Sequence, residues 1–204
     1  MNTALMSDKL KKIARAAKPW AFLVGAFLVL KVTGAGSAIS DFTRAAAMKT
    51  GAMDIEPETT VTGGQAFDYD FTIRDLQGNK LSMNELKGKV IFLNLWATWC
   101  GPCRVEMPSI QKLYNSVDKD KIAFVMLSLD QDNQSDKIRQ FVSGKEFSFP
   151  VYQPASPLPK MLRVNMIPTT FIIGADGKVR TKKTGMANYD TEEMRDFLAK
   201  LVAE

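Results

Sequence analysis

The chain has 204 residues, of which 46% are hydrophobic, 24% charged and 9% aromatic, a balance typical of folded proteins and not of disordered or collagen-like chains. Two cysteines and no histidine exclude a zinc site built from four Cys and His ligands, a Ser-His-Asp triad and a Cys-His nucleophile pair. The formal net charge of +5 arises within residues 1–40, so the remaining chain lacks the basic surplus that a nucleic-acid-binding domain would need.

Residues 1–39 form a basic and then apolar leader, which predicts a membrane anchor or an export signal. The apolar run Trp20–Leu30 has the length of a signal-peptide core, about 7 to 15 residues, and Gly36-Ser37-Ala38 is a passable cleavage site. Continued to Ile39, the segment is long enough to span a bilayer as a helix of about 20 residues, and we favour this uncleaved single-pass anchor. The positive-inside rule then places the rest of the chain on the extracytoplasmic side of the inner or cell membrane, or free in the periplasm if the leader is cleaved.

Residues 40–64 lack periodicity and mix Gly, Pro, Thr and charged side chains, which predicts a tether to a folded domain at 65–204. That domain begins with alternating polar and apolar residues at Asp68–Arg74, and Gln77-Gly78-Asn79 follows as a turn before the next apolar residue. The pattern predicts an added N-terminal β-hairpin.

The rest of the domain alternates between predicted strands and helices. Val90–Leu95 is a short apolar strand, and a helix from Pro102 to Tyr114, interrupted or bent at Pro108, follows it. The later predicted elements are a buried strand at Ile122–Leu129, a helix from Asp136 to Val142 that ends at Gly144, a strand at Thr169–Ile173, a turn at Asp176-Gly177 and an amphipathic helix at Thr191–Val202. This order predicts an α/β fold with a mixed central sheet, half parallel and half antiparallel, flanked by helices.

Cys100-Gly101-Pro102-Cys103 joins the first buried strand to its helix, and two thiols at this spacing can close a small disulfide ring. Cys100 lies at the helix N-terminus, where unpaired N–H groups and the helix dipole favour a thiolate, so it is the expected attacking sulfur. Pro102 suits the first helical position. Cys103 is the expected resolving sulfur, which breaks the mixed disulfide between Cys100 and a partner.

Two other interpretations of the cysteine pair are weaker. A structural disulfide across so short a loop would stabilise the fold little. A metal site would need further ligands from another chain. We therefore expect reversible redox exchange, with no metal and no cofactor beyond the cysteine pair itself.

Two motifs together resemble those of thioredoxin-fold proteins: Trp99-Cys100-Gly101-Pro102-Cys103 and Ile167-Pro168-Thr169-Thr170-Phe171. The branch that the chain is most similar to is the TlpA/ResA-like membrane-anchored thiol:disulfide oxidoreductases, over about Ala66 to Val202. The resemblance implies a thioredoxin fold with a cis Pro168 beside the dithiol, where the adjacent backbone pairs with an extended substrate. Trp99, Gly101, Pro102, Ile167 and Pro168 are accordingly the expected supporting and substrate-binding residues.

The strand position that carries a buried carboxylate in ordinary thioredoxin is Asn94 here, and an amide cannot accept the proton of the second cysteine. Glu106 lies three residues after Cys103, on the same helical face, and is the candidate proton acceptor, a role that the resemblance to ResA-like proteins supports. The alternative is an exposed acid in the first helical turn that only complements the helix dipole.

The direction of exchange is predicted to be reductive. The chain has no histidine between its cysteines, and its Gly-Pro pair resembles thioredoxin, whose potential of about −270 mV lies well below the roughly −120 mV of a strong oxidant. The resemblance implies a membrane thiol-electron donor and, as clients, disulfide-containing exported proteins, including apocytochrome c before haem attachment.

Two rival functions stay open at this point. One is a thiol peroxidase of the AhpC/TSA redoxin group, although the PxxxTxxC arrangement typical of peroxide-attacking cysteines is absent around Cys100. The other is a non-catalytic tethered binding module that uses the groove beside Pro168 without exchange.

Overall fold

The computed structural model describes Asp54 and residues 64–204. The predicted leader at 1–39 and nearly all of the predicted tether at 40–64 lie outside the described residues. In the part of the chain that the structure describes, no helix is both long and apolar enough to cross a membrane.

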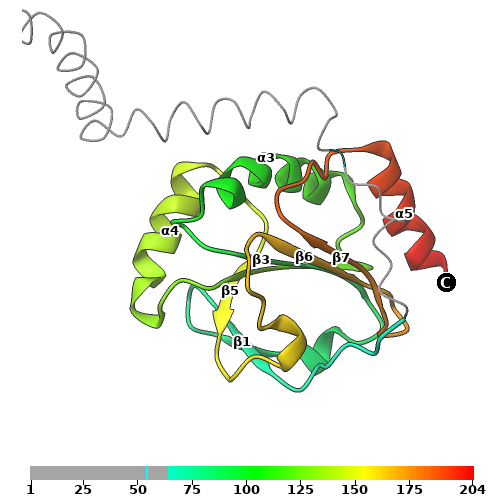
Figure 1. The fold of residues 1–204 in the computed structure, drawn as a ribbon, viewed down its shortest axis with the longest axis horizontal. Coiled ribbons are helices and arrows are strands. Elements are labelled where there is room, and N and C mark those ends of the chain that lie inside the picture. The colour runs from blue at the N-terminus through cyan, green and yellow to red at the C-terminus, as the bar shows by residue number, and fades with distance from the viewer. Residues whose placement is uncertain (1–53, 55–63) are drawn as a thin grey trace, which may run out of the picture. The chain divides into compact units, whose positions relative to one another are not determined.

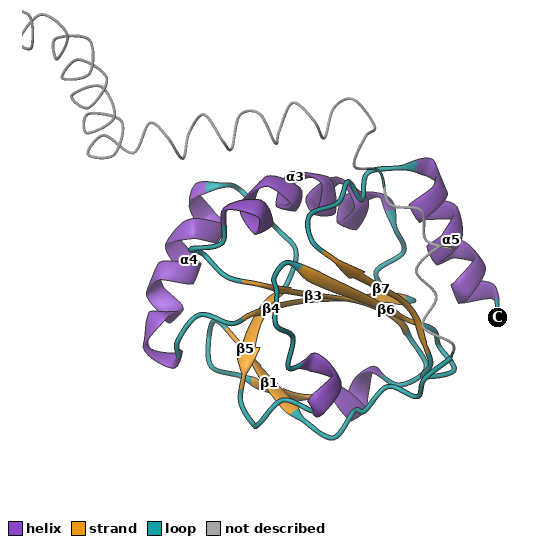
Figure 2. Ribbon diagram, in the orientation of Figure 1, coloured by secondary structure: helices purple, strands orange, loops and turns teal. Residues whose placement is uncertain are grey.

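One mixed sheet organises the described domain, with the strand order β2-β1-β5-β4-β3-β6-β7 (Figures 1 and 2). The strands are β1 (Thr72–Asp75), β2 (Lys80–Ser82), β3 (Val90–Trp96), β4 (Ile122–Ser128), β5 (Val151–Pro154), β6 (Thr169–Ile173) and β7 (Val179–Thr184). The helices are α3 (Gly101–Ser116), α4 (Ser135–Gly144) and α5 (Glu192–Ala203), with short 3-10 turns η2 (Met83–Leu86), η3 (Asp132–Gln134) and η4 (Lys160–Leu162). The predicted α/β thioredoxin fold, with a mixed sheet flanked by helices, is confirmed.

Strand β3 lies at the centre of this sheet and all seven of its residues are buried. It pairs in parallel with β4 and antiparallel with β6. Because side chains alternate across a strand, Val90, Phe92 and Trp96 join the core beneath the helices, while residues 91, 93 and 95 join the core on the opposite face. Asn94 belongs by this alternation to the helix-covered face.

Helix α3 starts at Gly101, with Cys100 as its N-cap, and runs to Ser116. It is one continuous element across Pro108, so of the predicted interruption or bend at that residue the interruption is wrong. The apolar residues 107, 110 and 113 are buried against the sheet, and this packing outweighs the loss of one helical hydrogen bond at the proline. The dithiol is thereby fixed where a central strand ends and a buried helix begins.

The antiparallel parts of the sheet lie at its two ends. Strands β6 and β7 pair across the predicted turn at Asp176-Gly177, where Gly177 has a φ of 79°. Strand β1 pairs antiparallel with β2 and also with β5. Strand β5 was not predicted, because it is short and Pro150 and Pro154 break up the pattern. It links the N-terminal hairpin to the rest of the sheet.

Candidate active site

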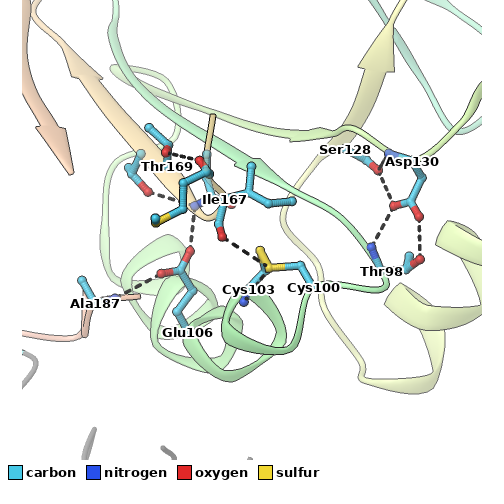
Figure 3. The surroundings of a disulfide bond; sticks show 12 residues. Thr98, Cys100, Cys103, Glu106, Ser128, Asp130, Ile167, Thr169 and Ala187 are labelled. Atoms are coloured by element: carbon cyan, nitrogen blue, oxygen red, sulfur yellow. Dashed lines mark hydrogen bonds between the residues drawn. A yellow bond between two sulfur atoms is a disulfide. The ribbon is translucent and has the colours of Figure 1, made fainter. Parts of the chain in front are cut away.

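Cys100 and Cys103 form a disulfide at the N-terminus of α3, with their Cα atoms 5.3 Å apart (Figure 3). The backbone N–H of Cys103 donates to Cys100 Sγ over 3.2 Å. Cys100 is 5% exposed and Cys103 is 0% exposed, so a partner reaches the sulfur of Cys100 first. The predicted division into an outer and an inner sulfur agrees with this geometry.

The segment before β6 lies against the same disulfide. The Ile167–Pro168 peptide bond is cis, and the carbonyl oxygen of Ile167 lies 3.8 Å from Cys100 Sγ (Figure 3). Pro168 is buried and Ile167 is half-buried. The structure therefore brings both residues to the cysteine pair, although 67 residues separate Ile167 from Cys100 in the sequence.

Two large apolar side chains stand out from the surface of the described domain. Trp99, next to Cys100, is 65% exposed, and Met166, next to Ile167, is 59% exposed. Gly101 and Pro102 are half-buried in the first turn of α3. Trp99, Gly101 and Pro102 were predicted from the sequence, but Met166 was not; the one feature that could have indicated it is its position two residues before Pro168.

Glu106 is 0% exposed and points from α3 toward the sheet (Figure 3). Its Oε1 accepts a hydrogen bond from Asn94 Nδ2 over 2.8 Å, and its Oε2 accepts one from the backbone N–H of Ala187 over 3.2 Å. Burial raises the pKa of Glu106 to about 8, and the bonds from Asn94 and Ala187 oppose that rise. The alternative of an exposed acid in the first helical turn is therefore wrong.

The hydrogen bonds continue beyond Asn94 into the sheet. Asn94 Nδ2 also donates to Thr170 Oγ1 over 2.9 Å, and the hydroxyl of Tyr189 donates to the same oxygen over 2.7 Å. Asn94 and Thr170 are a cross-strand pair of β3 and β6. Burial, and then the charge of Glu106, raise the pKa of Tyr189 well above its ordinary value, so its hydroxyl stays protonated as a donor.

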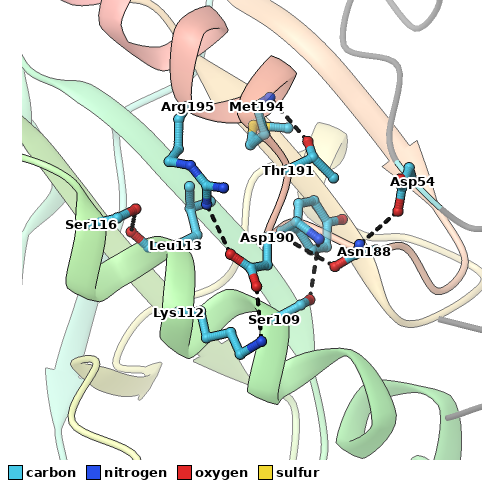
Figure 4. A network of polar contacts seen from close by, with 11 residues as sticks. Asp54, Ser109, Lys112, Leu113, Ser116, Asn188, Asp190, Thr191, Met194 and Arg195 are labelled. Atoms are coloured by element: carbon cyan, nitrogen blue, oxygen red, sulfur yellow. Dashed lines mark hydrogen bonds and ion pairs between the residues drawn. The ribbon is translucent and has the colours of Figure 1, made fainter. Parts of the chain in front are cut away.

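The segment that supplies the Ala187 N–H is fixed to two helices (Figure 4). The backbone N–H of Tyr189 donates to Ser109 Oγ of α3 over 3.1 Å. Asp190 accepts bonds from Lys112 of α3 over 2.9 Å and from Arg195 of α5 over 2.8 Å. These contacts hold the donor in place against Glu106. These contacts were not predicted, because no local sequence pattern links residues 187–190 to α3.

The described residues bring together no group of three or more His, Cys, Asp or Glu side chains able to hold a metal ion. The chemistry that the arrangement offers comes from two sulfurs, of which Cys100 is 5% exposed and Cys103 is 0% exposed, and from one buried carboxyl group whose pKa is raised to about 8. The two sulfurs can form and break a disulfide, and the carboxyl group of Glu106 can hold a proton inside the protein.

We predict that the oxidised full-length protein loses stability as the pH rises from 5 to 9. Between pH 4.5 and about 8 the folded protein keeps a proton on Glu106 that the unfolded chain has released, so the free energy of unfolding falls with pH. The fall should be roughly 3 to 5 kcal/mol. Hydrogen bonds lower the pKa values of Asp75 and Asp176, so the protonation of these two groups changes stability only at pH values below this range.

Urea unfolding at a series of pH values measures the effect. Glu106→Gln should remove most of the slope, whereas Glu193→Gln, at an exposed position of α5, should keep it. An unchanged slope in Glu106→Gln would contradict the assignment.

The comparisons with known proteins agree with this site. The model of the AhpC/TSA family matches residues 63–182. The thiol-disulfide oxidoreductase ResA of Bacillus cereus is 34% identical over 133 residues, which cover 65% of this chain and 75% of that protein. The thioredoxin-like protein YneN of Bacillus subtilis is 34% identical over 130 residues, which cover 63% of this chain and 76% of that protein.

A solved structure has the same fold. The crystal structure of StoA from Bacillus subtilis superposes with a TM-score of 0.52 at 25% identity, over 62% of this chain and 95% of that one. The residues that the family model matches include the cysteine pair and the β6 segment. The chain belongs to the AhpC/TSA family and, within it, to the ResA-like thiol-disulfide oxidoreductases.

Proposed function

We propose that this protein reduces disulfides in exported proteins by thiol:disulfide exchange through Cys100 and Cys103. The observation that carries the proposal is the asymmetry of the cysteine pair: Cys100 is reachable at the N-terminus of α3, beside the Ile167 carbonyl, while Cys103 is fully buried behind it. The outer sulfur, which is partly accessible, can attack a client, whereas the fully buried inner sulfur can react only with the sulfur next to it.

The exchange starts from the dithiol. The Cys100 thiolate attacks one sulfur of a client disulfide, a bond forms between Cys100 and that sulfur, and the client's other sulfur leaves as a thiolate. The Cys103 thiol then loses its proton and attacks Cys100 Sγ, which releases the second client thiolate and closes the Cys100–Cys103 disulfide. The client gains two electrons and, with the protons that its thiolates take up, two thiols.

The N-terminus of α3 supports the first step. In the oxidised protein the Cys103 N–H already donates to Cys100 Sγ. The same donor stabilises negative charge on that sulfur once the disulfide opens, as the helix dipole also does. Cys100 therefore becomes a thiolate more easily than a free cysteine, whose pKa is about 8.5.

Glu106 is the proton acceptor for the second step. Bonds from Asn94 and Ala187 stabilise its carboxylate, while burial makes that carboxylate a stronger base than an exposed one. With a pKa of about 8, Glu106 keeps a proton at neutral pH in the oxidised protein. This is the protonation state expected after it has taken the proton of Cys103.

The client surface is formed by the exposed side chains of Trp99 and Met166 and by the backbone at Ile167 and Pro168. Trp99 offers a large rigid apolar face, and methionine adapts to differently shaped partners. The surface therefore suits an extended apolar segment that flanks a client cysteine. Clients of this class include apocytochrome c before haem attachment, a candidate that rests on the family resemblance.

The leader at 1–39 supports an extracytoplasmic site of action, with the domain anchored to the membrane by a single span or free in the periplasm. Because exchange oxidises the dithiol, a reductase outside the cytoplasm needs a supply of electrons, and a membrane thiol-electron donor is the partner proposed for it.

The family name AhpC/TSA also covers the rival peroxidase function. Against that rival stands the active-site sequence, which has two cysteines at close spacing and no PxxxTxxC arrangement.

Cys103→Ser should trap clients as mixed disulfides on Cys100, because the sulfur that releases them is missing. Non-reducing gels followed by mass spectrometry would identify the adducts in extracts from the extracytoplasmic side. Cys100→Ser is the matched control and should trap none. A binding module without exchange would give no adducts with either variant, and rapid peroxide consumption by the wild-type protein would favour the peroxidase.

Glu106→Gln should slow the release of a trapped client at pH 7 by roughly tenfold or more, because an amide cannot accept the Cys103 proton. The apparent pKa that governs release should rise. Stopped-flow measurements of mixed-disulfide resolution across a pH series would test this, with Glu193→Gln as an exposed charge-matched control. A pH–rate profile identical to that of the wild-type protein would remove Glu106 from the mechanism.

The equilibrium of the dithiol with a series of glutathione buffers should give a reduction potential near the value of about −270 mV known for thioredoxin, because Gly-Pro separates the cysteines and no histidine lies between them. The measurement is the fraction of oxidised protein at each buffer ratio. A potential close to about −120 mV would reverse the proposed direction and make the protein an oxidant.

A further inference from the structure

A buried carboxylate holds the loop that leads into the dithiol. The side chain of Asp130, in the segment after β4, is buried and accepts three hydrogen bonds (Figure 3). Its Oδ2 accepts one from the backbone N–H of Thr98 over 2.8 Å and one from Ser128 Oγ over 2.7 Å. Its Oδ1 accepts one from Thr98 Oγ1 over 2.6 Å.

These contacts continue the parallel pairing of β3 and β4 past its last residue pair. Trp96 and Ser128 are the final partners of the two strands. The backbone N–H of Leu129 then donates to the carbonyl of Trp96 over 2.8 Å, and Asp130 takes both donors of Thr98. Thr98 is two residues before Cys100, whose own backbone N–H donates to the Ala97 carbonyl over 3.1 Å, so the bonds to Asp130 fix the middle of the turn that carries the reactive sulfur.

Stabilising the core is not a sufficient reason for a buried carboxylate at position 130. Taking a carboxylate out of water is costly, and apolar residues of similar volume fill a core without that cost. What a carboxylate adds is direction, since its two oxygens bind the two donors of Thr98 at once and fix both the backbone and the side chain of that residue. The fixed residue lies in the turn that sets the position of Cys100 over the first turn of α3.

We propose that Asp130 and Thr98 act as a clamp that holds Cys100 Sγ against the Cys103 N–H and thereby sets the reactivity of the Cys100 thiolate. Both are positioning residues, since they act through the turn and not on the client. The inference rests on the proposed function, because it concerns the attacking sulfur of the exchange. It adds a determinant of that sulfur's reactivity on an element that carries neither cysteine.

Thr98→Val removes the hydroxyl bond to Asp130 Oδ1 at almost constant side-chain volume. The turn should then hold Cys100 less closely to the Cys103 N–H, and the thiolate should lose part of its stabilisation. In a Cys103→Ser background, where Cys100 is the one remaining thiol, alkylation of the full-length protein by iodoacetamide at pH 7 should slow by about three- to tenfold. The midpoint of the pH–rate profile should move upward.

Two further variants separate the clamp from a general loss of stability. In the same Cys103→Ser background, Thr98→Ser keeps the hydroxyl and should restore the rate and midpoint of the parent. Ile173→Val shortens a fully buried side chain at the far end of β6, which lowers stability without touching the turn, and it should leave alkylation unchanged. The charged side chains on the elements around Cys100 are the same in all these variants; they include Arg104, Glu106 and Lys112 in α3, Asp130 and Asp132 after β4, and Lys160 and Arg163 in the segment that leads to Pro168.

Each outcome bears on one of the two proposals. Equal alkylation rates and midpoints for Thr98→Val and its parent would overturn the clamp, as would equal slowing in Thr98→Ser or in Ile173→Val. If the wild-type protein fails to exchange disulfides with glutathione or clients, the proposed function fails, whatever the alkylation rates show.

Discussion

The hydrogen bond from the Cys103 amide to Cys100 Sγ exists because the fully buried strand β3 and the short turn at residues 97–100 place Cys100 at the N-cap of α3. Helix N-termini leave N–H groups unpaired, and here the N-cap is a cysteine whose sulfur takes one of them. The site therefore uses a feature that every helix has. What makes it specific is the rigidity of the support, which has β3 on one side and the segment after β4 on the other.

Burial gives the two halves of the site their different chemistry. Cys100 lies at the edge of the core, whereas Cys103 and Glu106 lie inside it on successive turns of one helix. A carboxyl group in that position would be costly without donors, and Asn94 and Ala187 provide them from β3 and from the loop before α5. The fold thus places a carboxyl group of raised pKa out of contact with water, as the proposed role in proton transfer requires.

Much of this could be predicted from local patterns. The spacing of the cysteines, the helical spacing from Cys103 to Glu106 and the apolar run of β3 are all short-range signals, and each was interpreted correctly as to position. The contacts of Asn94 with Thr170 and of Thr98 with Asp130 span 76 and 32 residues, so no local pattern reveals them. Strand β5 was missed for a related reason, since its pairing with β1 and β4 and not its own short sequence makes it a strand.

The order of the strands has a consequence for the proposed reduction of client proteins that have not yet folded. Such clients present extended backbone with unsatisfied amides and carbonyls, which can add to any open sheet margin. In the described domain one margin is β2, only three residues long, and the other is β7, whose Lys182 is exposed. The short length of β2 and the exposed lysine of β7 both discourage strand addition at the sheet edges, so clients are expected to bind beside Cys100 and not along the sheet.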